Sequence, residues 1–427
     1  SKSFVLFRMA ISVETNTIAK REITTCCIAG GGPAGMMLGY ILARAGVSVI
    51  VLEKHKDFFR DFRGDTVHPS TLELMHELGL LEEFLKLPHQ ELRNIGGQFG
   101  DFVFTAADLT HLPVQCGFVA LMPQWDFLNF LAEQGKRFRT FDLRMEHDVT
   151  GLIEESGRIR GVRIQTPGGI TEIEAELVVG CDGRHSTVRS ATGLEVINLG
   201  VPIDVLWFRI SREPDDPYQA LGRIDYGKML ILINRNDYFQ AGLIVFKGAF
   251  DAVKAAGLPA FRESLVQVAP FLDDRVAEIT DWEQVKLLSV QINRLRQWYK
   301  PGLLCIGDAA HAMSPAGGVG INLAIQDAVA AANILASPLR EGNLTEALLA
   351  KIQERREFPV RVIQAIQARI HNASLNFLGN PVKAHAPWQM RAFMHLPGLT
   401  RITGRALGLG VRPEHIRTPI EPSAIVH

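Results

Sequence analysis

The chain has 427 residues, 47% of them hydrophobic and 21% charged, which indicates a globular protein with a large core and excludes a small binding module. Its 45 Lys and Arg residues against 46 Asp and Glu residues leave a net charge of -1, so no global field exists to hold nucleic acid. The five cysteines form no CxxC pair, which predicts neither disulfides nor a metal site and favours a reducing, cytoplasmic setting.

The first patterned part of the chain predicts a βαβ unit. We expect residues 1–22 to form a loosely held extension, because they lack the order of a signal peptide. A β-branched and apolar run at 24–29 predicts a strand, the pattern at 36–45 predicts a helix, and the apolar run at 47–52 predicts a second strand. Helical spacing over 70–85 predicts a further helix, which Gly79 interrupts.

The middle of the chain predicts a different architecture. Residues 95–118 have no helical period and predict strands, and alternating apolar and polar residues at 205–210, 229–233 and 239–245 predict an antiparallel sheet. A buried-strand pattern at 303–306 and an Ala-rich helical pattern at 319–335 resume the first architecture, so the sheet is an insertion. After Pro338 we expect mainly helix to about residue 377.

A glycine-rich turn joins the first strand to the first helix and fits the pattern GxGxxG. Gly30 permits the tight turn, Gly32 lets the backbone approach a pyrophosphate, and Gly35 allows close helix packing. Glu53 ends the second strand, where a carboxylate accepts hydrogen bonds from an unphosphorylated ribose, as in FAD or NAD. The alternative is a tight turn without a ligand. The dinucleotide-binding residues predicted here are Gly30, Gly32, Pro33, Ala34, Gly35, Glu53 and Lys54.

Two later stretches follow in a characteristic order. Residues 178–189 contain Asp182, Gly183 and Arg189, and residues 305–311 contain Gly307 and Asp308, followed by a glycine-rich stretch at 315–322. With the first motif, these stretches resemble the three fingerprints of the flavoprotein aromatic hydroxylases, also called group A flavin monooxygenases. The resemblance covers roughly residues 24–335 and implies a fold like that of para-hydroxybenzoate hydroxylase.

The resemblance implies FAD as the bound cofactor. Asp308 would accept hydrogen bonds from the ribityl chain, next to Gly307, which avoids a clash. The helix that begins after Gly318 and Gly320 would stabilise negative charge on a reduced flavin, and Pro315 would lie beside the flavin ring. The alternatives are a helix N-cap at Asp308 and a flexible loop at the glycines. The other residues of this stretch assigned to cofactor binding are Ile321 and Asn322.

In this family the middle motif lies where FAD and a transient nicotinamide cofactor approach each other. The resemblance therefore assigns Asp182 and Gly183 to the cofactor site, and Arg189 has the charge that a phosphate requires. The alternative is a simple turn at Asp182 and Gly183, with Ser186 as a helix cap and Arg189 as a surface charge.

Three single residues also match the family by position. Arg63 matches an arginine that faces the FAD phosphate and ribose, and Gln124 matches a glutamine near the cofactor, although each could instead be a surface polar group. His68 could face the flavin ring or a substrate phenol, although a lone histidine is more often a structural hydrogen-bonding partner. We therefore name His68 and Pro315 as the catalytic candidates.

The resemblance implies hydroxylation of an aromatic or other electron-rich lipophilic substrate. NADH or NADPH would supply electrons, and O2 would react through a flavin C4a-hydroperoxide. The inserted sheet would cover the flavin ring with apolar side chains, such as those of Leu206, Phe208, Leu232 and Leu243. The alternatives are an FAD-dependent reductase of isoprenoid double bonds and a non-catalytic flavin redox sensor. The WxWxI motif of flavin halogenases is absent.

The expected fold class is α/β, with a Rossmann-type FAD-binding domain, an inserted, mostly antiparallel sheet domain that binds substrate, and a C-terminal helical region. The FAD-binding domain would comprise residues 23–94, 118–196 and 289–340. The sheet domain would comprise residues 95–117 and 197–288, and the C-terminal region residues 341–427. The basic, partly apolar end of the chain could make weak peripheral contact with a membrane, but packing over the FAD-binding domain is the simpler interpretation. We expect a monomer or homodimer with a small lipophilic aromatic substrate.

Overall fold

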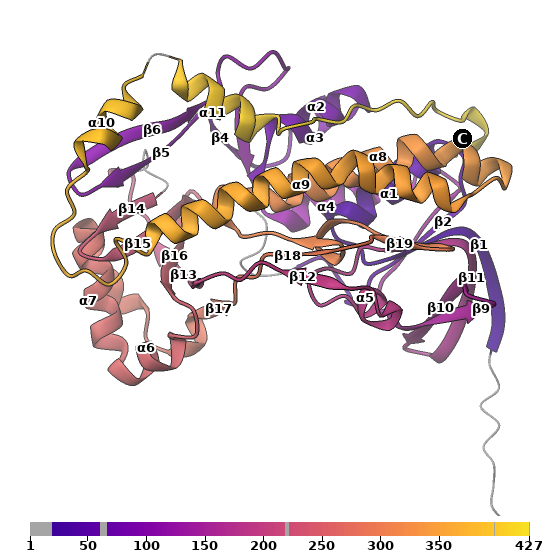
Figure 1. Ribbon diagram of the computed structural model, residues 1–427, viewed down its shortest axis with the longest axis horizontal. Helices are drawn as coiled ribbons and strands as arrows, with labels where there is room; N and C mark the ends of the chain where they lie inside the picture. Colours follow the sequence, from indigo (N-terminus) through magenta and orange to yellow (C-terminus); the bar gives the residue numbers. More distant parts are fainter. Residues whose placement is uncertain (1–18, 60–65, 218–221, 397, 427) are drawn as a thin grey trace, which may run out of the picture.

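Figure 1 shows the computed structural model, which describes residues 19–59, 66–217, 222–396 and 398–426. The α/β class is confirmed, because a mixed sheet crossed by long helices lies beside a second sheet with its own short helices. The predicted extension at 1–22 falls mostly outside the described residues. Its last residues belong to the first strand, β1 (Ala19–Ala29).

The larger sheet has a parallel centre. Its strand order is β19-β20-β11-β1-β2-β8, and β10 and β9 add to β11 by antiparallel pairing. The central strands are buried on both faces, as parallel strands covered by helices are. Their bounds are β2 Val49–Leu52, β8 Phe141–Arg144, β9 Asp148–Glu155, β10 Arg158–Thr166, β11 Gly169–Gly180, β19 Tyr299–Lys300 and β20 Leu303–Cys305.

Three helices lie side by side over this sheet: α1 (Pro33–Arg44), α8 (Gly320–Glu341) and α9 (Glu346–Ser374) (Figure 1). Helix α4 (Gln124–Gly135) packs against α1. The helix predicted over 70–85 is present as α2 (Pro69–Glu77) and α3 (Leu81–Phe84), separated at Gly79, whose φ of +72° favours glycine.

The helix predicted at 319–335 is longer than expected. It continues through Pro338 to Glu341, although proline removes one backbone hydrogen bond and usually ends a helix. Leu335 and Leu339, on either side of this proline, are buried in the main core, so their burial outweighs the lost bond. The helical stretch Ala316–Glu341 is also apolar enough to suit a membrane span, but 78% of its most apolar part is buried inside the protein.

The inserted sheet has seven strands in the order β17-β13-β16-β15-β14-β5-β6. All neighbours pair antiparallel except β14 and β5, so the predicted antiparallel character is confirmed. The region predicted as strands at 95–118 supplies only β5 and β6. The bounds are β5 Asn94–Phe99, β6 Phe102–Asp108, β13 Ile203–Ser211, β14 Gly222–Asp225, β15 Lys228–Asn234, β16 Tyr238–Phe246 and β17 Lys286–Leu288.

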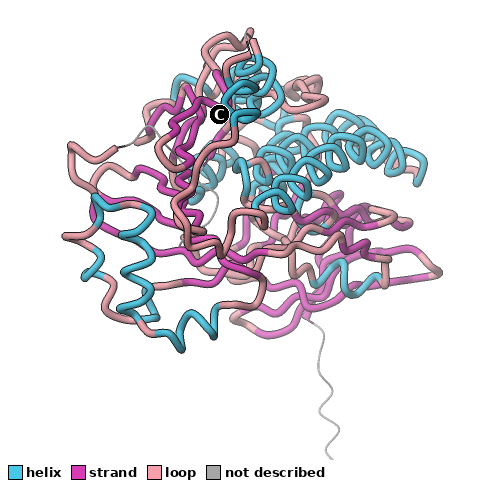
Figure 2. The backbone as a smooth tube through the Cα atoms, turned by 60° about the vertical axis from the view of Figure 1, so that its left-hand side comes forward, coloured by secondary structure: helices cyan, strands magenta, loops and turns pink. Residues whose placement is uncertain are grey.

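The two faces of this sheet differ, and the assignment of its apolar residues to the flavin side was wrong. The four side chains expected to cover the flavin pack instead under α6 (Phe250–Ala256) and α7 (Leu258–Val268), which cover the outer face (Figure 2). Successive strand residues point to opposite faces, and the alternation alone does not reveal which face meets the cofactor domain. The misassigned residues are Leu206, Phe208, Leu232 and Leu243.

The opposite face of the seven-stranded sheet is turned toward the FAD-binding residues. Val205, Trp207 and Ile233 pack there against Val119 and Leu121 of β7. This strand is the centre of a small sheet of order β3-β7-β4, and the edge strand β3 leads directly to His68. The remaining short strands are β3 Thr66–Val67, β4 Gln90–Leu92, β7 Val119–Leu121, β12 Val196–Asn198, β18 Asn293–Leu295 and β21 His311–Ala312.

The C-terminal region packs on both parts of the molecule. Helix α10 (Trp388–Met394) and helix α11 (Leu399–Gly408) lie beside β6, and the C-terminal segment, residues 409–426, returns along the helices of the larger sheet (Figure 1). Arg44 of α1 donates a hydrogen bond to the Thr418 carbonyl, and Phe138 pairs with Ile425. The segment therefore packs over the FAD-binding domain, while membrane contact stays a prediction.

Candidate active site

The glycine-rich turn places an uncapped helix terminus beside open space. A Cβ atom at Gly35 would lie 1.9 Å from the Gly30 carbonyl oxygen, so this glycine is required for packing. A Cβ at Gly32 would have no atom within 4 Å, and no side chain caps α1 at this residue. The first amides of α1, at Ala34 and Gly35, are therefore available to a pyrophosphate.

Glu53 lies directly after β2, beside the same turn. Its two carboxylate oxygens accept hydrogen bonds from the amides of Gly31 at 3.1 Å and His55 at 3.0 Å. The side chain is largely buried, whereas Lys54 is exposed. The carboxylate thus lies next to the α1 terminus, where the ribose of a dinucleotide would be expected.

The middle motif caps a helix and contacts the third motif. Asp182 accepts hydrogen bonds from Ser186 and from the Val188 amide, and burial raises the pKa of Asp182 despite these bonds. Ser186 in turn caps α5 (Thr187–Thr192) by accepting from the Arg189 amide. The capping alternative therefore describes this geometry, and Gly183, with a φ of +84°, has open space around its Cβ position.

Two arginines of this motif have separate contacts. The Arg189 guanidinium donates to the carbonyl oxygens of Ala309 at 3.2 Å and Arg184 at 2.5 Å, so it joins the middle motif to the third. Arg184, which the sequence interpretation missed, lies 3.5 Å from the Asp308 carboxylate. Its place directly after Asp182 and Gly183 was the available signal. A role for Arg189 at a phosphate stays a prediction.

The third motif follows strand β20 and meets α1. Gly307 has a φ of +60°, and a Cβ there would lie 3.3 Å from that of Ala34. The neighbouring Asp308 is 31% exposed, in contrast to the buried residues around it. The structure therefore brings this carboxylate close to the pyrophosphate end of α1 and leaves it accessible to a ligand.

A second uncapped helix terminus lies after Pro315. Gly317 and Gly318 have φ values of +79° and +61°, and no side chain caps α8 at Val319. The amides of Gly320 and Ile321 begin the helix and are therefore free to stabilise an anion.

The Asn322 side chain holds this loop by hydrogen bonds. Its Oδ1 accepts from the His68 amide at 2.9 Å and from Thr71 at 2.7 Å, and its Nδ2 donates to the carbonyls of Thr66 and Gly318 at 3.2 Å. A direct contact between the Asn322 side chain and the cofactor stays a prediction.

His68 is buried under the C-terminal helix. Its Nδ1 lies 2.9 Å from the carbonyl oxygen of Leu407 in α11. Burial lowers the pKa of His68, although the carbonyls of Leu407 and Gly317 oppose the shift, so the ring is neutral at pH 7 and donates from Nδ1. These contacts are structural, and a catalytic role for His68 stays a prediction, as it does for Pro315.

The structure describes only one of the last two predicted residues. Gln124 is the first residue of α4 and is half-buried, and a contact with the cofactor stays a prediction. Arg63 lies outside the described residues.

These features fit a dinucleotide cofactor. Two uncapped helix termini, an open glycine cradle at Gly32 and an accessible carboxylate at Asp308 supply the donors and acceptors that FAD requires along its length. Family comparison agrees, because residues 23–366 match the model of an FAD binding domain. The chain belongs to the FAD-dependent aromatic hydroxylase family. It is an FAD-dependent monooxygenase.

This monooxygenase is similar to proteins of Streptomyces species. It is 32% identical to 6-methylpretetramide 4-monooxygenase of Streptomyces rimosus, with 81% of this chain and 84% of that protein covered. It is also 29% identical to dialkyldecalin synthase of Streptomyces rugosporus, of whose length the alignment covers 63%.

Solved structures share the fold. The OxyS anhydrotetracycline hydroxylase of Streptomyces rimosus superposes with a TM-score of 0.71 at 24% identity, over 92% of this chain and 77% of that one. The p-nitrophenol 4-monooxygenase PnpA of Pseudomonas putida superposes with a TM-score of 0.70 at 19% identity, over 91% of this chain and 95% of that one. These likenesses confirm the overall architecture.

Proposed function

We propose that this monooxygenase hydroxylates an extended, largely apolar aromatic compound, with NADH or NADPH as the electron donor. The observation that carries the proposal is the sheet face turned toward the FAD-binding residues. A cavity of about 160 Å³ opens on the seven-stranded sheet, lined mainly by apolar side chains such as Met229, Ile231 and Ile244. The similarity to 6-methylpretetramide 4-monooxygenase supports a substrate related to that compound.

One polar group on this face adds a requirement for the substrate. The indole nitrogen of Trp207 is buried and has no hydrogen-bond partner among the described residues. Buried indole N–H groups usually find an acceptor. A phenol or carbonyl oxygen on an otherwise apolar ring system would supply it.

When bound, FAD supplies the redox chemistry with O2, and the protein binds, orients and excludes water. The α1 terminus would hold the pyrophosphate, Asp308 the ribityl hydroxyls, and the α8 terminus would stabilise negative charge on the ring. The apolar sheet face around Trp207 would keep water away from the reacting centre. No side chain is assigned as the base that takes the substrate proton.

The remaining parts of the proposal concern partners. The sequence shows no second strand-glycine-helix unit, so the nicotinamide donor would bind briefly near Gly183, where the Cβ position is open. We extend the proposal to a cytoplasmic protein that is a monomer or a homodimer.

The test is to measure NAD(P)H oxidation, O2 uptake and product formation by the FAD-loaded protein with phenols, quinols and polycyclic aromatics. We expect one compound class to stimulate NAD(P)H use, with O2 consumed and a hydroxylated product formed. A yellow protein whose turnover is never coupled to oxygen would contradict the proposal and favour the reductase, the sensor or a cyclising enzyme like the dialkyldecalin synthase.

A further inference from the structure

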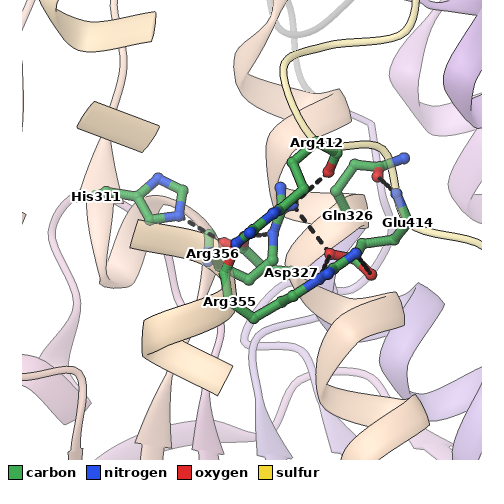
Figure 3. Close-up of polar contacts among 8 residues, drawn as sticks. His311, Gln326, Asp327, Arg355, Arg356, Arg412 and Glu414 are labelled. Atoms are coloured by element: carbon green, nitrogen blue, oxygen red, sulfur yellow. Dashed lines mark hydrogen bonds and ion pairs between the residues drawn. The ribbon is translucent and has the colours of Figure 1, made fainter. Parts of the chain in front are cut away.

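A row of buried charged side chains leads from the third FAD motif into the C-terminal segment (Figure 3). It begins at Asp327 in the middle of α8, whose side chain is 0% exposed. Asp327 Oδ2 accepts hydrogen bonds from the Gly307 amide at 3.1 Å and from His311 Nε2 at 2.5 Å. Asp327 therefore holds the backbone directly before Asp308, the residue expected to contact FAD.

The other oxygen of this carboxylate faces α9. Asp327 Oδ1 accepts from Arg356 Nε at 2.9 Å, and the Arg356 side chain is 1% exposed. Arg356 Nη1 donates to the Arg412 carbonyl at 3.1 Å and to Glu414 Oε1 at 3.3 Å. One buried arginine thus joins Asp327 to two groups of the C-terminal segment.

Glu414 is tied to the same place by further bonds. Arg355 donates to its two carboxylate oxygens at 2.7 and 3.2 Å, and the Glu414 amide donates to Oε1 of Gln326, the neighbour of Asp327 on α8. The Glu414 side chain is only 5% exposed, although it lies in an extended segment far from α8 in the sequence. The segment is therefore docked through its backbone as well as its charge.

The two arginines of this row offset its two carboxylates. Arg355 and Arg356 pair with Glu414, and Arg356 also pairs with Asp327. His311 Nδ1 is buried without a hydrogen-bond partner among the described residues. Burial would raise the pKa of Asp327, but His311 and Arg356 outweigh it and hold the pKa below its usual range.

We propose that Glu414 is a positioning residue for FAD, and that docking of the C-terminal segment and binding of FAD are coupled through Arg356 and Asp327. Glu414 orients the Arg356 guanidinium, the guanidinium orients the Asp327 carboxylate, and the carboxylate fixes the Gly307 amide beside Asp308. Coupling between two sites is reciprocal, so FAD must also strengthen the docking of the segment. The inference rests on FAD binding and not on the proposed substrate.

The first test compares two variants of the same segment in the full chain. Glu414→Gln removes the charge from the buried row, whereas the control Glu421→Gln removes a carboxylate that pairs with the surface residue Arg340 at 3.1 Å. We expect titration of the apoproteins to show FAD affinity about tenfold weaker for Glu414→Gln, within the usual range of coupling between sites, and within twofold of the parent for Glu421→Gln. Thermal unfolding of each apoprotein is measured alongside.

The second test uses the unaltered protein. Trypsin can cleave after the exposed Arg417, within the docked segment, and cleavage requires local opening. We expect saturating FAD to slow cleavage at Arg417 about tenfold and to slow it much less in Glu414→Gln, while cleavage after Lys254 in α6 is unchanged.

The proposal is overturned if Glu414→Gln is less stable yet binds FAD as tightly as the parent, or if FAD leaves cleavage at Arg417 unchanged. Either outcome would reduce the row to structural support. Failure of the parent to bind FAD would instead contradict the cofactor assignment, and an FAD-bound protein that hydroxylates no aromatic compound would contradict only the proposed function.

Discussion

The FAD-binding loops and the seven-stranded sheet use the chain in different ways. The loops offer backbone amides to a ligand, at helix termini and at glycines. A Cβ atom at these glycines would meet either a neighbouring carbonyl or open space. The sheet presents side chains, and its two faces bury different sets of apolar residues. A backbone site requires particular residue types at fixed spacing, whereas a side-chain face tolerates many apolar residues of similar volume. The backbone site can therefore be predicted from sequence, whereas the role of each side-chain face cannot.

The largest effect should come from the backbone site. Gly35→Ala would place a methyl group against the Gly30 carbonyl, and we expect a loss of about 3 kcal/mol in stability together with loss of FAD binding. Gly32→Ala has no atom within 4 Å of the new methyl group, so stability should persist while FAD binding fails. Thermal unfolding and FAD titration check both. Normal FAD affinity in Gly32→Ala would show that the pyrophosphate does not lie at this terminus.

Adjacent residues of β13 test the two faces of the sheet. Leu206→Ala empties a site under α6 and α7, so we expect a loss of about 2 to 3 kcal/mol with an unchanged KM. Trp207→Phe removes an unpartnered donor on the other face, so stability should change by less than about 1 kcal/mol while KM rises several-fold. Chemical denaturation and steady-state kinetics measure the pair. A KM that responds to Leu206 instead would mean that substrate enters from the helical side.

The sheet region also contains a buried ion pair with a defined pH dependence. Arg275 donates to both carboxylate oxygens of Asp216, at 2.6 and 2.9 Å. Burial would raise the pKa of Asp216, but Arg275 and the Glu213 amide outweigh it and lower the pKa. A lowered pKa stabilises the fold above the unfolded value, about 3.9, and this contribution is lost as the pH falls through the folded value.

We therefore expect Asp216→Asn to cost about 2 kcal/mol at pH 7, and the difference from the parent to shrink below about pH 4. Urea unfolding at pH 7 and pH 3 measures it. An equal difference at both pH values would show that the carboxylate charge contributes nothing.

We expect the smallest loss of stability for Asp308→Ala, because this side chain of the FAD site is accessible. Asp308→Ala removes a carboxylate that is 31% exposed, so stability should hardly change. FAD affinity should fall about tenfold, as expected for the loss of a hydrogen bond to a charged group. Fluorescence titration with FAD provides the measurement. Unchanged affinity would show that the third motif does not contact the ribityl chain.

Sequence patterns predicted most of the strands, turns and helices that form the FAD-binding motifs. The strand, turn and helix around Gly30, the end of β2 at Glu53 and the position of Asp308 after β20 all lie where the spacing indicated. Each depends on local rules: glycine for positive φ or close approach, and polar residues at strand ends. The same rules did not indicate the hydrogen bonds that Asn322 makes within its loop, and they did not single out Arg184 beside Asp308.

By itself, the sequence determined the α/β class, the FAD-binding loops and the family, because these depend on residue types at short, regular spacings. Only the tertiary structure decided which face of the inserted sheet packs under α6 and α7, and that His68 contacts the Leu407 carbonyl. It also decided that Glu414 reaches Asp327 through Arg356. These contacts join residues far apart in the chain, and packing of whole elements sets them, so no local pattern records them.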